Sequence, residues 1–383
     1  MRRRNIATTL AALALGAMLA ATFHQEVAPR LGLPDVAAPA GSRDGGQAQA
    51  AAPTDPCAPV IAGLSTRQQL AQLLQVGVKP ENSEDAVAIV TAEQVGGIFI
   101  GGDAPGLLTG GALALVRAVS KLPITVSVDD EGGRVQRIDA MDGPLPSARA
   151  MVAANSPEQV RELAKTRGGQ LRARGVTMDL APVVDTSAQA DDTVIGDRSW
   201  SADPAVARAY AAAFAAGLRD AGVQPVLKHF PGHGNASGDS HQGLVATPPL
   251  AELKTNDLVP YQDIQSYGPI AVMVGHLDVP GLTDGTPATL SPAAYQLLRT
   301  EYAFDGVVMT DDLGAMKAVT NLVDLPEAVR QALAAGADVA LWSNGGRVGE
   351  VLDGLEQALG NGGLAKERVS DSLHRVLRSK GAC

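Results

Sequence analysis

The chain has 383 residues, of which 45% are hydrophobic and 19% are charged, and its formal net charge is −10. This composition is typical of a globular protein and excludes disorder as the main state of the chain. An acidic chain with only five Phe, five Tyr and two Trp residues lacks the cationic surface that binds phosphates and the rings that stack on bases, which excludes nucleic acid as a partner.

The amino-terminal segment predicts export from the cytoplasm. Residues 1–5 contain three arginines, and an apolar stretch follows at 6–23. This order is typical of a signal peptide, and the stretch is also just long enough to span a thin membrane. We therefore expect 1–23 to be a cleaved signal peptide or a membrane anchor, and the protein to be extracellular or bound to the cell envelope. No cysteine stands at the end of this segment, so it has no site for lipid attachment.

The next segment, 24–56, is rich in Ala, Gly, Pro, Gln and Asp and has no apolar periodicity, so we expect a disordered linker. The folded domain is expected to comprise 57–383. The two cysteines of the chain, Cys57 and Cys383, are the first and last residues of this domain. In an oxidising compartment such a pair favours a disulfide, and two free thiols are the alternative.

Eight short apolar runs follow Cys57 and alternate with longer segments of helical periodicity. Each run has the length and composition of a strand buried on both faces of a parallel sheet. Two of the helical segments, 204–221 and 325–335, place apolar residues four positions apart. Eight such units predict a closed (β/α)8 TIM barrel, with an open doubly wound sheet as the second possibility. The expected strands are 73–78, 97–100, 124–128, 178–184, 225–229, 271–275, 306–310 and 339–342.

Charged and polar side chains follow most of these runs. In a TIM barrel the catalytic residues lie where the strands end and the loops begin, so we expect these side chains to meet at one rim. Each has a structural explanation when taken singly, such as helix capping, but together they predict an active site. In chain order they are Asp129, Asp130, Glu131, Asp185, Arg198, Lys228, His229, His233, Asp239, His241, His276, Asp311 and Asp312.

Three histidines, His229, His233 and His241, lie close together in the sequence, so a metal site has to be considered. Together with Asp239 they have the right chemistry to bind zinc. The proline and glycines between them force an irregular loop, so the spacing is not the helical pair that metalloproteases use. We therefore expect no metal, and a metal-dependent barrel hydrolase is the alternative.

Four motifs in this order resemble glycoside hydrolase family 3, and in particular its β-N-acetylhexosaminidases of the NagZ type. The resemblance covers 57–383 and implies a single TIM barrel without a second α/β domain. The motifs are DDEGGRVQR at 129–137, IGDRSW at 195–200, KHFPGHGNASGDSH at 228–241 and VMTDDLGAM at 308–316.

The resemblance implies roles for eight residues and requires no cofactor. Asp311 matches the catalytic nucleophile, His241 matches the acid/base, and Asp239 matches the carboxylate partner of this histidine. The positions that hold the hydroxyls and the acetamido-bearing ring of the terminal sugar are matched by Asp129, Arg137, Arg198, Lys228 and His229.

These residue types suit a retaining glycosidase. Retention requires a carboxylate that attacks the anomeric carbon, and a second group that protonates the leaving oxygen and later deprotonates water. A histidine suits the second role because it titrates near neutral pH, and His241 lies in a Gly/Ser-rich loop that is able to move over a bound sugar. We therefore expect an exo-β-N-acetylglucosaminidase that releases terminal N-acetylglucosamine from peptidoglycan-derived cell-wall glycans through a covalent intermediate.

Other activities stay open at this point. A β-glucosidase or a glycosyl phosphorylase of the same family would use a similar site, and a neutral histidine does not repel phosphate as a carboxylate does. A glycan-binding protein without catalytic activity is the alternative outside the enzymes. The presence of Asp311, Asp239 and His241 argues against it.

Overall fold

The computed structural model describes residues 55–102 and 106–383, which include almost the whole predicted domain. The predicted signal peptide or membrane anchor at 1–23, and all but the last two residues of the predicted linker at 24–56, lie outside the described residues. Within the described ranges, no helix combines the length and the hydrophobicity that a membrane span requires.

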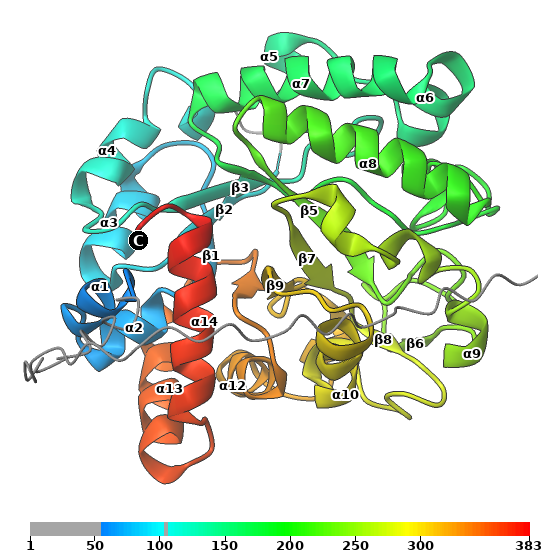
Figure 1. Cartoon of the computed structure of the whole chain (residues 1–383). Helices are drawn as coiled ribbons and strands as arrows, with labels where there is room; N and C mark the ends of the chain where they lie inside the picture. Colours follow the sequence, from blue (N-terminus) through cyan, green and yellow to red (C-terminus); the bar gives the residue numbers. More distant parts are fainter. Residues whose placement is uncertain (1–54, 103–105) are drawn as a thin grey trace, which may run out of the picture. The chain divides into compact units, whose positions relative to one another are not determined.

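The described part contains an eight-stranded parallel sheet, and each of the eight predicted strands is present in it. Neighbouring strands pair in the order β10-β1-β2-β3-β4-β5-β7-β9, and a parallel bridge between Met309 and Val339 joins the two ends of the sheet. The sheet therefore closes into a ring with helices around it, as Figure 1 shows, which confirms the predicted TIM barrel. The strands are β1 (Leu74–Val78), β2 (Gly97–Ile100), β3 (Thr125–Val128), β4 (Met178–Asp179), β5 (Gln224–Phe230), β7 (Ala271–Val274), β9 (Val307–Thr310) and β10 (Ala340–Trp342).

Strand β4 is shorter than the predicted run of 178–184. Pro182 lies in the second half of that run and has no N–H to donate to a neighbouring strand, so regular pairing cannot continue through it. The chain nevertheless stays beside β5, because Val183 forms a bridge with Lys228 and the N–H of Val184 donates to the Lys228 carbonyl at 2.7 Å. The segment therefore still delivers Asp185 to the rim of the barrel.

Helices cover the outside of the barrel, and the two predicted amphipathic segments are among them. They form α8, which Asp203 caps at its amino end, and α12, which Asp324 caps in the same way. Gly217 allows α8 to approach α7 closely, since a Cβ atom there would lie 2.3 Å from the Arg161 carbonyl oxygen. The described α-helices are α1 (Ala58–Ala62), α2 (Thr66–Ala71), α3 (Glu84–Glu93), α4 (Leu113–Val119), α5 (Asp139–Asp142), α6 (Ala148–Ala154), α7 (Pro157–Arg174), α8 (Pro204–Asp220), α9 (Leu250–Leu253), α10 (Pro292–Gln296), α11 (Lys317–Thr320), α12 (Leu325–Ala335), α13 (Val348–Asn361) and α14 (Lys366–Ser379).

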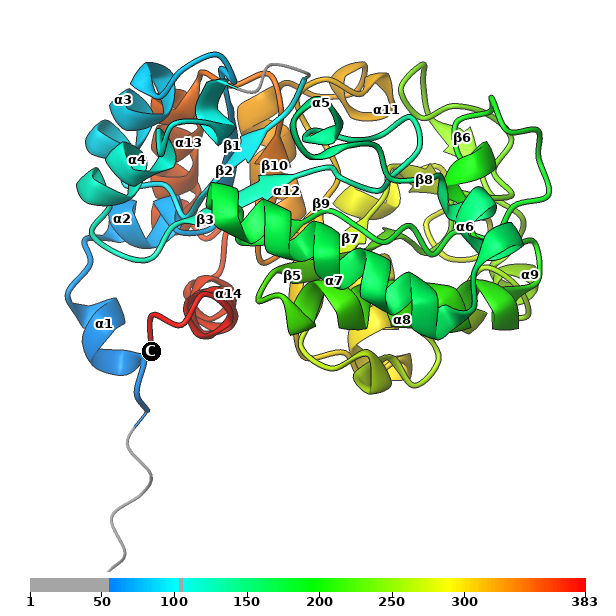
Figure 2. The same ribbon diagram turned by 90° about the horizontal axis from the view of Figure 1, so that it is seen from above.

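The last helix, α14, lies at the amino ends of the barrel strands. Ser379 at its end donates a hydrogen bond to the Gln224 side chain at the start of β5, at 2.9 Å. Figure 2 shows α14 and the carboxyl terminus on one side of the barrel, and α11 with the small strands β6 (Val245–Ala246) and β8 (Leu277–Asp278) on the other. Cys383 forms a disulfide with Cys57, and their Cα atoms lie 5.0 Å apart, as predicted from the sequence.

Candidate active site

The loops at the carboxyl ends of the strands surround a pocket of about 590 Å³. A pocket of this volume accommodates a sugar residue with space to spare. All eight site residues predicted from the sequence line it, although six of them come from four different loops and the other two, Lys228 and His229, from strand β5. They are Asp129, Arg137, Arg198, Lys228, His229, Asp239, His241 and Asp311.

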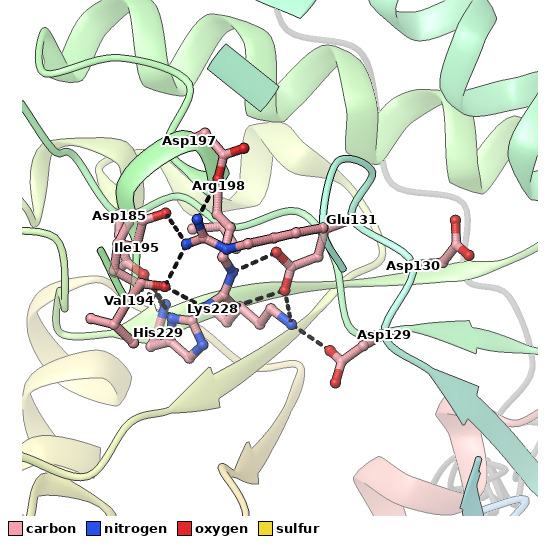
Figure 3. A network of polar contacts seen from close by, with 12 residues as sticks. Asp129, Asp130, Glu131, Asp185, Val194, Ile195, Asp197, Arg198, Lys228 and His229 are labelled. Carbon is pink, nitrogen blue, oxygen red and sulfur yellow. Dashed lines mark hydrogen bonds and ion pairs between the residues drawn. The ribbon is translucent and has the colours of Figure 1, made fainter. Parts of the chain in front are cut away.

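One wall of the pocket is a network of two cations and two carboxylates (Figure 3). Nζ of Lys228 lies 2.5 Å from an oxygen of Asp129 and 2.6 Å from an oxygen of Glu131. Arg198 binds Glu131 through two hydrogen bonds of 2.7 and 2.8 Å. The side chains of Lys228 and Glu131 are only 3% and 5% exposed, so the network is fixed before a ligand binds.

The charges of this network stabilise one another. Burial alone would raise the pKa of Glu131, but Arg198 and Lys228 outweigh it and hold that pKa well below its usual range. Burial alone would lower the pKa of Lys228, but Asp129 and Glu131 raise it instead. Both cations therefore stay charged, so the network offers fixed donors, and Asp129 offers a fixed acceptor, at the wall of the pocket.

The turn after Glu131 explains how the sequence places these groups. Gly132 has φ +91°, and a Cβ atom there would lie 2.3 Å from the Pro146 carbonyl oxygen, so the tight turn requires glycine. Asp130 points away from the network, as Figure 3 shows, and forms an ion pair with Arg167 at 3.3 Å. The other oxygen of Asp130 accepts the N–H of Arg137 at 2.8 Å and so fixes the backbone at Arg137.

A second buried carboxylate holds His229. Asp185 is fully buried, and one of its oxygens lies 2.7 Å from Nδ1 of His229. Its other oxygen accepts the backbone N–H of His233 at 2.7 Å. Burial would raise the pKa of Asp185, but the two histidines lower it overall. The carboxylate is therefore ionised and accepts the Nδ1–H of His229, which leaves Nε2 of that ring for a ligand.

Asp311 lies directly after β9. Its N–H donates to the Val274 carbonyl at 3.0 Å, and its Oδ1 accepts the N–H of Asp312 at 2.8 Å. Oδ2 of Asp311 has no hydrogen bond to another described residue. The neighbouring Asp312 has a different task, because its Oδ1 accepts the N–H of Gly314 at 2.8 Å and fixes the turn. Of the two adjacent aspartates, Asp311 thus has an oxygen free to react.

The surroundings of Asp311 keep it ionised. Burial would raise its pKa, but His276, His229, the N–H of Asp312 and Lys228 outweigh this effect and lower the pKa to about 2. A carboxylate with this pKa is charged at neutral pH, as a nucleophile must be.

The pair of Asp239 and His241 lies on the loop between β5 and β6. Oδ1 of Asp239 accepts the N–H of His241 at 2.9 Å and lies 2.6 Å from Nδ1 of its ring. Burial would raise the pKa of Asp239, but its contacts with His241 lower it overall. The imidazole therefore donates Nδ1–H to Asp239 and has Nε2 available for proton transfer. The side chain of His241 is 55% exposed, at the mouth of the pocket.

The three neighbouring histidines do not converge on one point. His229 contacts Asp185, His241 contacts Asp239, and Nε2 of His233 lies 2.9 Å from Oγ of Ser240. In the described ranges, no group of three or more His, Cys, Asp or Glu side chains is arranged to hold a metal ion. The geometry thus gives no support to the metal-dependent alternative.

Glu131 and Asp185 were given no individual role in the sequence analysis, although both follow predicted strands. Glu131 contacts Arg198 and Lys228, which are 67 and 97 residues away in the chain, and Asp185 contacts His229. Their position after a strand was the only available signal. Their partners become evident only when the barrel closes.

Residues 65–379 match the family model described as "Glycosyl hydrolase family 3 N terminal domain". The chain belongs to glycosyl hydrolase family 3. The family that the four motifs suggested is therefore confirmed, and the protein is a glycoside hydrolase.

Relatives within family 3 are similar over most of the chain. The "Beta-hexosaminidase LpqI" of Mycobacterium tuberculosis is 53% identical over 325 residues, which is 83% of each chain. A solved family 3 hydrolase of Mycobacterium smegmatis has a TM-score of 0.81 and 51% identity, and the match covers 83% of this chain and 98% of that one. A family 3 β-N-acetylglucosaminidase of Paenibacillus has a TM-score of 0.77 and 32% identity, over 83% of this chain and 62% of its own.

Proposed function

We propose that this glycoside hydrolase is an exo-β-N-acetylglucosaminidase that retains the configuration of the anomeric carbon. The observation that carries the proposal is the presence of an ionised Asp311 and the Asp239–His241 pair in one pocket. A carboxylate and a proton-transfer group on either side of one bound sugar are what a retaining glycosidase needs. The name of the LpqI relative supports a hexosamine as the sugar, and that of the Paenibacillus relative supports N-acetylglucosamine in particular.

In the first step, Asp311 attacks the anomeric carbon while Nε2 of His241 donates its proton to the glycosidic oxygen. The bond between the anomeric carbon and this oxygen breaks, and an ester bond forms between the sugar and Asp311. Before this step His241 is protonated, and Asp239, whose carboxylate lies 2.6 Å from its Nδ1, stabilises this charged form.

In the second step, the neutral His241 takes a proton from a water molecule whose oxygen attacks the anomeric carbon. The ester bond breaks, Asp311 is released as a carboxylate, and His241 carries a proton again. Two inversions give net retention. Throughout both steps, Asp129, Lys228 and His229 hold the sugar hydroxyls from fixed positions.

The substrate class follows from the proposed location. The arginines at 2–4 and the apolar stretch at 6–23 support export, so that N-acetylglucosamine-containing fragments of the cell wall are the substrates within reach. Water is the proposed acceptor, and phosphate is the alternative, since His241 carries no negative charge to repel it. Comparison of the products with and without phosphate distinguishes hydrolysis from phosphorolysis.

The decisive experiment traps the intermediate. An activated fluorosugar that resembles N-acetylglucosamine should label Asp311, and peptide mass spectrometry should find the label there. The neighbouring Asp312 is the internal control because it fixes the turn and should stay unlabelled. Asp311→Asn should lower turnover of an aryl N-acetylglucosaminide by several orders of magnitude. A label on another residue, or full turnover by the variant, would reject the proposal.

A further inference from the structure

The loop that carries His241 is attached to the rest of the barrel on one side by a buried histidine. Ser240 lies between Asp239 and His241 and is only 1% exposed. Its Oγ lies 2.9 Å from Nε2 of His233, which is itself 3% exposed. The backbone N–H of His233 donates to the buried Asp185, so this attachment point is rigid.

The same loop is attached on its other side to α11. The N–H groups of Lys317 and Ala318, the first two residues of this helix, donate to the carbonyl oxygens of His241 and Ser240, each at 3.3 Å. These N–H groups have no partner within the helix, so the loop satisfies them. Helix α11 directly follows the turn that begins at Asp311. The loop of the acid/base and the loop of the nucleophile are therefore joined by backbone hydrogen bonds.

We propose that His233 and the amino end of α11 form a clamp on Ser240 and His241, and that this clamp positions the acid/base relative to Asp311. The clamp comprises the His233–Ser240 contact and the two hydrogen bonds from Lys317 and Ala318. This inference rests on the proposed function, in which His241 transfers the proton. His233 is thus a positioning residue and does not contact the substrate.

The need for a clamp follows from the exposure of His241. Its ring has one partner, Asp239, which belongs to the same loop and would move with it. The Asp239–His241 contact therefore sets the orientation of the ring but not its distance from Asp311. Proton transfer requires a donor within hydrogen-bond reach of the leaving oxygen, so a small shift of the whole loop would be costly.

His233 has the properties that this role requires. Burial and the neighbouring His229 lower its pKa, so the ring is neutral and carries one N–H. With the proton on Nε2, this N–H donates to Ser240, and Nδ1, which has no partner among the described residues, is left as an acceptor. The opposite tautomer would leave a buried donor unpaired.

Two variants weaken the clamp at different points. Ser240→Ala removes only the oxygen that contacts His233. Lys317→Pro removes only the N–H that binds the His241 carbonyl, because proline is tolerated at the first position of a helix. The preceding Met316 has φ −87° and ψ 127°, the extended conformation that a residue before proline prefers. Lys317→Ala is the matched control, since it removes the same exposed side chain and keeps the N–H.

The readout is kcat/KM for two aryl N-acetylglucosaminides, one with a poor and one with a good leaving group. The loss of one hydrogen bond should lower the value by about threefold to tenfold for the poor leaving group in Ser240→Ala and in Lys317→Pro. The substrate with the good leaving group needs less acid assistance, so its kcat/KM should fall by less than about twofold. Lys317→Ala should resemble the unaltered protein with both substrates.

The His241→Ala background separates positioning from general damage. When the acid/base is absent, Ser240→Ala and Lys317→Pro should cause no further loss with the poor leaving group. Equal losses with both substrates, or an undiminished loss in the His241→Ala background, would overturn the clamp. The proposed function has its own criterion: it fails if His241→Ala itself affects both substrates equally, whatever the clamp variants do.

Discussion

The carboxylate of Asp185 lies 2.7 Å from Nδ1 of His229, and both residues are buried, with His229 lining the pocket. The same carboxylate accepts the N–H of His233, so it fixes the proposed sugar contact and the start of the acid/base loop together. Asp185 thus connects His229, the proposed sugar contact, with the loop that carries His241.

Replacement of Asp185 by asparagine should therefore weaken substrate binding. One of the two carboxylate oxygens would become an NH2 group that faces an N–H donor, and a charge-assisted hydrogen bond would be lost. We expect KM for an aryl N-acetylglucosaminide to rise by about tenfold to a hundredfold. Asp191→Asn is the matched control, because Asp191 lies on the same loop with its side chain 73% exposed. An unchanged KM in Asp185→Asn would show that His229 needs no such support.

Glu131 should be essential for stability. It neutralises both Lys228 and Arg198, and its loss would leave these two cations nearly buried with Asp129 as the remaining partner. We expect Glu131→Gln to lower the free energy of unfolding by about 3–5 kcal/mol, measured by urea denaturation. The exposed Glu350, which pairs with Arg347, provides the control, and Glu350→Gln should cost less than about 1 kcal/mol. Similar costs for the two variants would contradict the buried network.

The disulfide between Cys57 and Cys383 should contribute to stability but not to catalysis. It joins residues 326 positions apart in the sequence and lies beside the end of α14, whereas the pocket is lined by residues at the carboxyl ends of the strands. Serine at both positions should lower the free energy of unfolding by about 2–5 kcal/mol. The kcat of the folded variant should be unchanged. If a reducing agent had no effect on the denaturation midpoint of the unaltered protein, this account would be wrong.

Asp311 should stay reactive at acidic pH. Its pKa of about 2 lies below the ordinary value of 3.8, so the folded state holds this proton less tightly than the unfolded state. The corresponding stabilisation is complete above pH 3.8 and is lost as the pH falls towards 2. The rate of labelling by an activated fluorosugar, which needs no acid assistance, should therefore be constant between about pH 4.5 and 8. A fall of tenfold or more in this interval, attributable to a carboxyl group, would show that Asp311 is less perturbed than the structure indicates.

The barrel could be predicted because each strand is marked locally. A parallel strand buried on both faces is a short apolar run, and all eight runs form strands. The largest error is in β4, whose extent was overestimated because Pro182 was read as part of a run that it interrupts, whereas the other strand ends differ by one residue at most. The site residues could be placed at one rim for a related reason, since polar side chains that directly follow such strands meet there in any TIM barrel.

The contacts within the site could not be predicted, because they join residues that are distant in the sequence. Nothing near Glu131 indicates that it will bind Arg198 rather than another cation. The H-x3-H spacing of His229 and His233 argued against a helical metal site, but it did not identify Asp185 and Ser240 as the separate partners of the two rings. The attachment of Ser240 to His233, and of His241 to α11, depends on how two loops lie across the rim. Loop positions of this kind are set by the closed barrel as a whole.

The bond between Cys57 and Cys383 has a topological consequence. Because their Cα atoms are 5.0 Å apart, a short glycine linker would connect the two ends of the catalytic domain by peptide bonds as well. The polypeptide would then be a ring that can be cut elsewhere, for instance at the exposed residues 362–363 between α13 and α14. A circular permutant opened there should fold and retain its pocket, with its new termini between α13 and α14.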